Sequence, residues 1–240
     1  MFTTPHFIWL GIVILLIAGL LIFQKKYDWS FTCVMNIMLT ISIMSEVTKI
    51  LCNMMPAPDG RTGMILDPGD LPFHLCSIQI FLLFGLKFLI KSPSTKENLL
   101  GFMAPTMLIG AVLAFLVPTV GVEFTVVQVY QYFIFHTFLV FFSVYIIKNR
   151  LVNWTKKRYM QNISYLAMFA LLAMWINSSL SGVLPRVNFM YLVRPPMKDL
   201  PFLTLEHGWY VYFLHLVSLG LIIIPLFHLP FIIAERKKKQ

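Results

Sequence analysis

The chain has 240 residues, of which 58% are hydrophobic and only 12% are charged. A soluble domain usually carries about 25% charged residues, so roughly half of the expected charge is missing. Apolar runs of about 20 residues recur between short polar segments, the length that a membrane-spanning helix needs. This pattern excludes a soluble globular enzyme, a disordered chain and a disulfide-stapled secreted module. We expect a single all-α domain over residues 1–240, built as a polytopic membrane bundle.

Seven apolar stretches predict seven transmembrane helices. In chain order they cover Phe7–Phe23, Phe31–Asn53, Leu71–Ile90, Leu99–Val117, Val126–Ile147, Ile163–Leu184 and Gly208–Ala234. The first stretch lacks the basic start and cleavage site of a signal peptide, so we treat it as a helix of the mature protein. Two long connections, Met54–Asp70 and Pro185–His207, are rich in turn-forming residues, and long ordered loops are often functional.

The positive charges predict the orientation of the bundle. The chain holds 19 Lys and Arg against 10 acidic residues, with a formal net charge of +9. Fourteen of the basic residues fall on the side of the C-terminal tail and four on the opposite side, with Lys49 inside the second helix. Because basic loops stay in the cytoplasm, we expect the N-terminus outside and the C-terminus inside. The net charge is then a membrane-protein feature, and we expect no nucleic-acid partner.

Polar side chains gather in the outer half of the predicted bundle. With this orientation, five helices send polar groups to one depth, whereas the inner half shows no comparable set, and His6 and His228 look incidental. The outer set includes Glu46, Lys49, His74, Cys76, Gln79, His136, Asn177 and His215, and we count Asn188 of the second long connection with it. Glu46 and Lys49 stand three residues apart and can form an ion pair. Single polar residues often join membrane helices by hydrogen bonds, but the whole set indicates a functional pocket.

Cys76 admits three interpretations. Asp70 and Pro72 are typical of a helix start, with Asp70 as the N-cap, which puts Cys76 in the second turn of the third helix. The helix dipole there favours a thiolate, and a histidine such as His136 at the same depth would give a nucleophile and base pair. Alternatively, Cys76 is an inert packing residue. It could also form a disulfide with Cys52 at the outer end of the second helix.

The sequence gives no indication of a metal or a cofactor. The three cysteines have no CxxC spacing, and His207 and His215 stand eight residues apart without further ligands. There is no Walker A sequence, no GxGxxG and no GxSxG elbow.

Three segments resemble one family of membrane proteins. Leu71-Pro72-Phe73-His74-Leu75-Cys76 resembles the LPLHLC-type motif of the YwaF-like, transmembrane protein 164-like family. The aromatic stretch 131–136, ending in His136, and the stretch 188–196, from Asn188 to a Pro-Pro pair, resemble two further family segments. The chain departs from the pattern at Phe189, where the family usually has Tyr.

The resemblance implies a lipid acyltransferase. The animal relative moves a fatty acyl group between phospholipids with a cysteine nucleophile and a histidine base, which correspond to Cys76 and His136 here. More distant relatives, the androgen-induced-type lipid hydrolases, use Thr in place of Cys. The resemblance therefore leaves transfer and hydrolysis open.

Our principal hypothesis from the sequence is an acyltransferase or transacylase of the outer leaflet of the cell membrane. Cys76 would form an acyl-thioester and His136 would move the protons, while Asn177, Gln79 or a backbone N–H would stabilise the oxyanion. Arg186 and Arg194, together with Lys198, suit a lipid phosphate at headgroup level. Membrane lipids would be both donor and acceptor. The alternatives are a lipid ester hydrolase and a transporter or receptor for a small solute, although no inverted repeat is visible.

Overall fold

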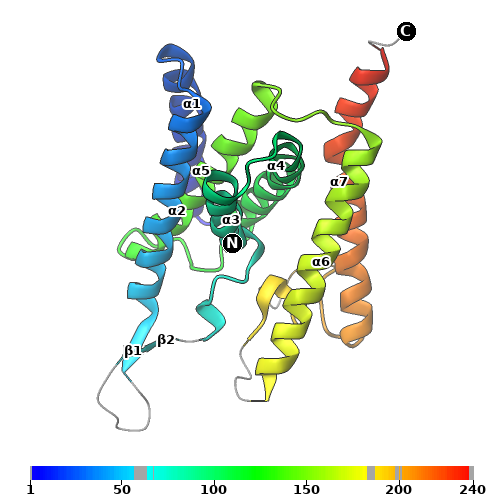
Figure 1. The fold of residues 1–240 in the computed structure, drawn as a ribbon. Coiled ribbons are helices and arrows are strands. Elements are labelled where there is room, and N and C mark those ends of the chain that lie inside the picture. The colour runs from blue at the N-terminus through cyan, green and yellow to red at the C-terminus, as the bar shows by residue number, and fades with distance from the viewer. Residues whose placement is uncertain are drawn as a thin grey trace.

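The computed structural model describes residues 2–56, 64–66, 68–182, 187–197, 200 and 202–237. It is an all-α bundle, and Figure 1 shows its helices. These are α1 (Thr4–Lys26), α2 (Phe31–Asn53), α3 (Leu75–Phe84), the π-helical continuation η2 (Gly85–Leu89), α4 (Pro93–Leu116), α5 (Val127–Lys148), α6 (Lys156–Ser181) and α7 (Trp209–Lys237). The predicted fold class is confirmed.

Shorter elements fill the two long connections. Strands β1 (Met54–Pro56) and β2 (Met64–Leu66) pair antiparallel, and the 3-10 turn η1 (Pro68–Asp70) follows them. A second 3-10 turn, η3 (Phe189–Tyr191), lies between α6 and α7. Both connections therefore contain ordered structure in the parts that are described, as their turn-forming residues predict.

Six helices of the described chain are long and apolar enough to cross a membrane, and the apolar helix Leu75–Leu89 is shorter. At 1.5 Å per residue, this helix is about 22 Å long, less than the roughly 30 Å of a bilayer core. The predicted start at Leu71 is wrong. Residues 71–74 form bends, with the Phe73 N–H donating to the Leu71 carbonyl at 2.8 Å, and the first helical bond runs from the Ile78 N–H to the His74 carbonyl.

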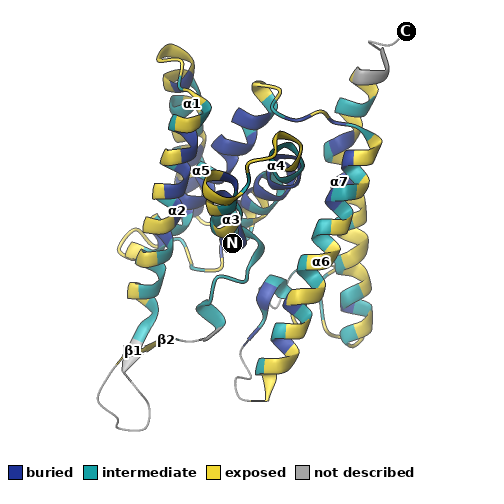
Figure 2. Cartoon of the chain, in the orientation of Figure 1, coloured by how far each residue is buried: buried dark blue, intermediate teal, exposed yellow. Residues whose placement is uncertain are grey.

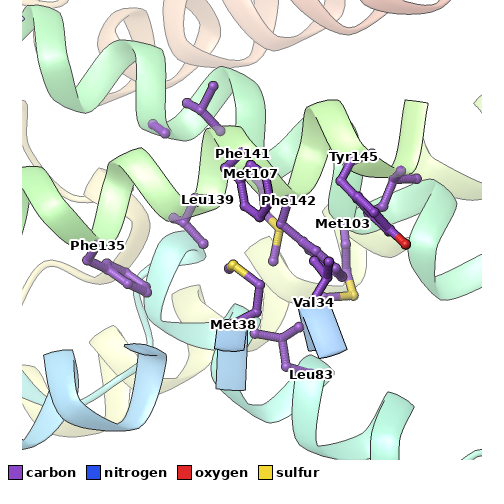
Figure 3. Packing of buried hydrophobic residues seen from close by; sticks show 14 of the residues in the cluster. Val34, Met38, Leu83, Met103, Met107, Phe135, Leu139, Phe141, Phe142 and Tyr145 are labelled. Atoms are coloured by element: carbon purple, nitrogen blue, oxygen red, sulfur yellow. The ribbon is translucent and has the colours of Figure 1, made fainter. Parts of the chain in front are cut away.

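The core lies between α4 and α5, which pack against each other; α5 also packs against α2, and α4 against α3. Figure 3 shows its centre, where side chains from α2, α3, α4 and α5 interlock. Among the residues labelled there are Val34, Met38, Leu83, Met103, Met107, Leu139, Phe141 and Phe142. Flexible methionines fill the gaps between the Phe rings of α5, and close packing of this kind holds membrane helices together where lipid is as apolar as the core.

Helices α6 and α7 lie side by side, away from the group formed by α1 to α5 (Figure 1). In Figure 2 they are mostly exposed or half-buried, whereas buried residues make up much of α5 and the middle of α4. An apolar helix with an exposed surface is typical of contact with lipid. The pair therefore joins the core mainly at its two ends.

We name the two ends of the bundle after one residue each. The Cys76 end comprises the starts of α3, α5 and α7 and the ends of α4 and α6. The Arg158 end comprises the starts of α4 and α6 and the last turns of α7. At the Cys76 end, α1 is attached by His6, whose Nε2 donates to the Phe115 carbonyl at 2.7 Å. His6 is fully buried, so our reading of it as incidental is wrong.

Candidate active site

Cys76 is the second residue of α3 and lies in its first turn, not in the second. His74, and not Asp70, occupies the N-cap position, and its side chain makes no capping hydrogen bond. Within the described chain, no hydrogen bond is formed by the backbone N–H groups of Leu75, Cys76 and Ser77. These are the N–H groups that a helix start leaves without intrahelical partners. The Cys76 thiol therefore stands among unused backbone donors, at the positive end of a helix dipole.

The thiol packs against a glycine of the neighbouring helix. A Cβ added to Gly110 of α4 would lie 3.3 Å from the Cys76 sulfur, tighter than most contacts of its kind. One turn further along α3, the Gln79 amide donates to Thr106 Oγ1 at 3.1 Å and to the Leu75 carbonyl at 3.3 Å. Gln79 and Thr106 thus fix the register of α3 on α4, and that register holds Cys76 at Gly110.

His136 lies in the middle of α5 with 6% of its surface exposed. Its ring contacts the rings of Tyr132, at 4.3 Å between centroids, and of Phe135 and Phe115. Nδ1 lies 2.7 Å from the Tyr132 carbonyl oxygen. A carbonyl only accepts, so Nδ1 carries the proton and the neutral ring keeps a lone pair on Nε2. No partner for Nε2 is present among the described residues, which leaves this atom available as a base.

Tyr132 links His136 to Cys76. Its ring lies tilted by 48° against the His136 ring, and its side chain lies near that of Cys76. Its hydroxyl donates to the Ala114 carbonyl at 3.1 Å and is also hydrogen-bonded by Thr119. No direct hydrogen bond joins Cys76 and His136 in the described part of the chain. Catalytic bonds in ligand-free enzymes are often long and close only on the substrate complex.

A third hydroxyl reaches the site from the connection between α6 and α7. Tyr191 in η3 is hydrogen-bonded by Thr119 and interacts electrostatically with Cys76. Its ring lies 5.1 Å from the ring of His74. Tyr191 and Thr119 were not among our candidates, because both lie in connections that a projection of helices cannot place. The family-like segment 188–192 contained the only signal for Tyr191.

Side chains of α6 and α7 hold this turn in place. The Asn177 amide donates to the Phe189 carbonyl at 3.1 Å and accepts from the Phe189 N–H at 2.8 Å. Asn188 bonds the backbone of Val193 and Arg194, and Trp209 Nε1 donates to the Leu192 carbonyl at 2.9 Å. The side chains of the predicted site residues Asn177 and Asn188 therefore bond the backbone of this turn and of the residues that follow it.

Phe189, where the chain departs from the family pattern, is fully buried. Its ring packs edge-on against Phe73, at 5.2 Å between centroids, and lies 5.6 Å from the ring of His74. The side chain at this position thus faces the residues before α3, where a hydroxyl has no obvious role.

The remaining predicted residues divide into two groups. Glu46 and Lys49 form the expected ion pair at 2.6 Å, and each side chain is 17% exposed. Lys49 lies close enough to His74 to act on it: burial, with this charge in addition, lowers the pKa of His74 to about 4. His215 lies elsewhere, exposed on α7 and bonded through Nδ1 to the Phe202 carbonyl at 2.7 Å. Its assignment to the polar cluster is wrong, because α7 turns this face away from the core.

Three headgroup candidates lie in the connection between α6 and α7. Arg194 is exposed, and its backbone is bonded by Asn188. Arg186 and Lys198 lie outside the described residues.

All three cysteines are free thiols. The disulfide between Cys52 and Cys76, one of the three interpretations left open by the sequence, is not formed. No group of three or more His, Cys, Asp or Glu residues suited to a metal ion occurs in the described ranges.

A second polar cluster occupies the Arg158 end, where we expected none. Arg158 forms an ion pair with Glu97 at 3.0 Å and hydrogen-bonds Asn98 and Gln161. Asn162 donates to the Gly101 carbonyl at 2.7 Å and contacts His228 Nε2 at 2.9 Å. The expectation was wrong because α4 and α6 begin six and seven residues earlier than their apolar stretches, and the polar residues sit on these extensions.

A depression of about 320 Å³ lies at this same end. It is lined by Phe31, Pro93, Lys96, Glu97, Leu100, Leu151 and Asn153. None of these residues belongs to the Cys76 site.

The apolar spans define the class of this molecule: it is a multi-pass membrane protein of about seven helices. The chain belongs to the TMEM164 family, whose model matches residues 1–228. No curated protein and no solved structure matches the chain.

Proposed function

We propose that this protein is a lipid acyltransferase or transacylase that forms an acyl-thioester on Cys76. The observation that carries the proposal is the arrangement around Tyr132. This residue contacts the His136 ring and lies near Cys76, while His136 keeps Nε2 unprotonated and unpartnered in the described chain. A free thiol and a base with a fixed tautomer are the two parts that cysteine-based acyl transfer requires.

In the first step, His136 Nε2 takes the thiol proton and the Cys76 sulfur attacks the carbonyl carbon of a lipid ester. The Nδ1 bond to the Tyr132 carbonyl holds the ring in this tautomer and supports the positive charge that forms. The tetrahedral intermediate collapses as the C–O bond breaks, and the leaving lysolipid oxygen receives the proton from Nε2. The products of this step are the acyl-thioester and a neutral histidine.

In the second step, the hydroxyl of an acceptor lipid gives its proton to His136 Nε2 and attacks the thioester. The C–S bond then breaks, and the Cys76 sulfur recovers the proton. Because the site is walled by aromatic rings from α4 and α5, water has little access. Exclusion of water favours transfer to a lipid hydroxyl over hydrolysis.

The candidates for the oxyanion hole differ in whether their N–H donors already have hydrogen-bond partners. Both polar atoms of the Asn177 amide are bonded to Phe189, and the Gln79 amide nitrogen is bonded to Leu75 and Thr106. The N–H groups of Cys76 and Ser77, at the start of α3, are unpartnered among the described residues. Backbone donors beside the nucleophile are therefore the best-placed group for the oxygen that becomes negative.

We further propose that the Cys76 end faces the outside of the cell membrane and that substrates enter from the outer leaflet. The support is the 14-to-4 division of basic residues in the sequence. Arg186 and Arg194 would then lie at headgroup level, where guanidinium groups bind lipid phosphates.

Acyl transfer by purified protein in mixed micelles tests the proposal. Wild type, Cys76→Ala and Cys52→Ala would be given a phospholipid with a labelled acyl chain and an unlabelled lysolipid acceptor. We expect Cys76→Ala to lose at least about 10³-fold in rate, as nucleophile replacements do. Cys52, exposed at the end of α2, is the matched control, and its variant should keep the wild-type rate. Full activity of Cys76→Ala would refute the thioester mechanism.

A further inference from the structure

The turn that carries Tyr191 is strained. Met190 and Tyr191 both have φ of 55°, in the left-handed region that side chains other than glycine rarely adopt. Such a conformation is unfavourable for these residues, and it persists only where the surroundings impose it. Two consecutive residues of this kind indicate that the position of this turn serves something other than chain connection.

The surroundings do impose it. The Tyr212 hydroxyl donates to the Tyr191 carbonyl, Asn177 clamps both backbone groups of Phe189, and Trp209 holds the Leu192 carbonyl. Tyr212 is fully buried, so this support is rigid. Backbone bonds on both sides of Tyr191 thus fix the direction in which its side chain leaves the turn.

That side chain lies over the start of α3. The Tyr191 ring lies 5.1 Å from the His74 ring, and the side chain is hydrogen-bonded by Thr119 and interacts with Cys76. The neighbouring Tyr132 hydroxyl already donates to Ala114. For the Tyr191 hydroxyl, by contrast, no hydrogen bond that it donates is present in the described part of the chain.

We propose that Tyr191 is a catalytic residue, whose hydroxyl donates a hydrogen bond to the acyl carbonyl oxygen while Cys76 attacks the carbonyl carbon. The inference rests on the proposed function and adds a side-chain donor to the backbone N–H groups of α3. Tyr191 forms no covalent bond and loses no proton. The thiol proton still passes to His136 and from there to the leaving oxygen, as described above.

The protonation of Tyr191 agrees with a donor role. Burial raises the pKa of Tyr191, and the nearby Cys76 raises it further, whereas the Thr119 hydrogen bond lowers it. The hydroxyl therefore keeps its proton at neutral pH and can give it to a substrate oxygen.

Two reactions of the same thiol test this role. Acylation by a fatty acyl ester passes through an oxyanion, whereas alkylation by iodoacetamide is a direct displacement at carbon and forms none. Intact-protein mass spectrometry measures the rate of both on Cys76, in a Cys33→Ala, Cys52→Ala background. We expect Tyr191→Phe to slow acylation about 10²-fold or more, as loss of one oxyanion donor does. Alkylation should stay within about twofold of the parent rate, since no donor to an oxyanion is used.

Tyr130→Phe is the control, because Tyr130 is exposed on α5, and it should change neither rate. Equal acylation of Tyr191→Phe and the parent would overturn the role of Tyr191 and leave the proposed function standing. An equal slowing of acylation and alkylation would also overturn it, because Tyr191 would then act on the thiol. If the parent protein forms no acyl-thioester at all, the proposed function and this inference both fail.

Discussion

His136 and His228 make the same local bond at opposite ends of the bundle and differ at the other ring nitrogen. In each, Nδ1 bonds the carbonyl four residues earlier, Tyr132 at 2.7 Å and Ile224 at 2.9 Å. At the Arg158 end, His228 Nε2 accepts from Asn162. At the Cys76 end, His136 Nε2 has no partner in the described chain. Both ring nitrogens of His228 are therefore hydrogen-bonded within the fold. In His136 only Nδ1 is bonded, and Nε2 is free to act as a base.

The surrounding groups repeat this difference. Around His228, the charge of Arg158 is neutralised by Glu97. The Asn162 amide nitrogen donates to the Gly101 carbonyl and to His228 Nε2. Around His136, the Cys76 thiol and the first N–H groups of α3 are unused. At the Arg158 end, most polar groups bond one another, and their bonds join α6 and α7 to the core. At the Cys76 end, the unused groups remain available to bind a substrate. Burial of polar groups alone does not separate the two ends, and Arg158 Nε and Asn162 Oδ1 are buried without a partner as well. The difference is that the unused groups at the Cys76 end include a thiol and a histidine nitrogen, which can act as nucleophile and base.

The first prediction compares the two histidines directly. We expect His136→Gln to lose about 10²–10⁴-fold in acyl transfer, the usual contribution of a general base. Its thermal midpoint in detergent should change little, since no described side chain depends on Nε2. His228→Gln should instead lower the midpoint, because Asn162 loses a buried acceptor at a cost of about 1–3 kcal/mol. The rate per folded molecule should be unchanged in that variant.

Acyl-transfer assays and thermal unfolding of the same preparations check both halves of this prediction. If His228→Gln lost activity without loss of stability, the Arg158 end would be a functional site, and the distinction between the two ends would be wrong.

The second prediction removes the charge at the Arg158 end. Arg158→Ala leaves the Glu97 carboxylate and the Asn98 side chain without their partner. We expect a loss of about 2–4 kcal/mol in unfolding free energy, somewhat below that of a fully buried pair because Glu97 is partly exposed. The variant Lys157→Ala, which changes a neighbouring exposed residue, is the control. Urea unfolding in detergent measures both, and equal stability of the two variants would contradict the role given to Arg158.

Much of the fold follows from the sequence because lipid imposes simple rules. A segment in hydrocarbon must be helical and apolar, so the bounds of α2 and nearly those of α5 could be read directly. Segments outside the hydrocarbon need not be apolar, so hydropathy does not show where their helices begin or end. The caps Ser92 and Thr155, which accept from Thr95 and Arg158 N–H groups, mark the true starts of α4 and α6, but apolarity cannot show them.

The site was predictable to the same degree. Cys76 and His136 lie on helices, so their depth follows from position along the chain. Tyr191 depends on left-handed backbone angles and on clamps from Asn177 and Tyr212, which no local pattern specifies. In the sequence, Arg158 was only one of the fourteen basic residues on the side of the C-terminal tail. Its burial requires Gly101 on another helix, where an added Cβ would lie 2.6 Å from Arg158 Cδ.

The third prediction uses two glycines of α4. Gly101 meets Arg158 and Gly110 meets the Cys76 sulfur, at 2.6 and 3.3 Å from an added Cβ. Gly101→Ala should lose about 1–3 kcal/mol in stability, as overpacked sites do, with normal activity per folded molecule. Gly110→Ala should keep most of its stability and lose activity, because the thiol must shift from its place. Gly85→Ala, with nothing within 4 Å of the added Cβ, controls for the helix backbone. Loss of stability without loss of activity in Gly110→Ala would mean that the position of Cys76 is not critical.

The fourth and smallest effect concerns His74 at the Cys76 end. Its pKa is lowered to about 4 by burial and, second, by Lys49, from an ordinary value of 6.5. The folded state therefore binds fewer protons than the unfolded state between these two values. The stability that His74 contributes is fully present above pH 6.5 and is lost as the pH falls towards 4. The slope of the unfolding free energy against pH is at most about 1.4 kcal/mol per pH unit, and it is smaller here because His74 is only half-buried.

We expect thermal midpoints to fall between pH 7 and pH 5 less steeply in His74→Gln than in wild type. His207→Gln, at an exposed position, should keep the wild-type slope, and an unchanged slope in His74→Gln would show that His74 does not titrate in this range.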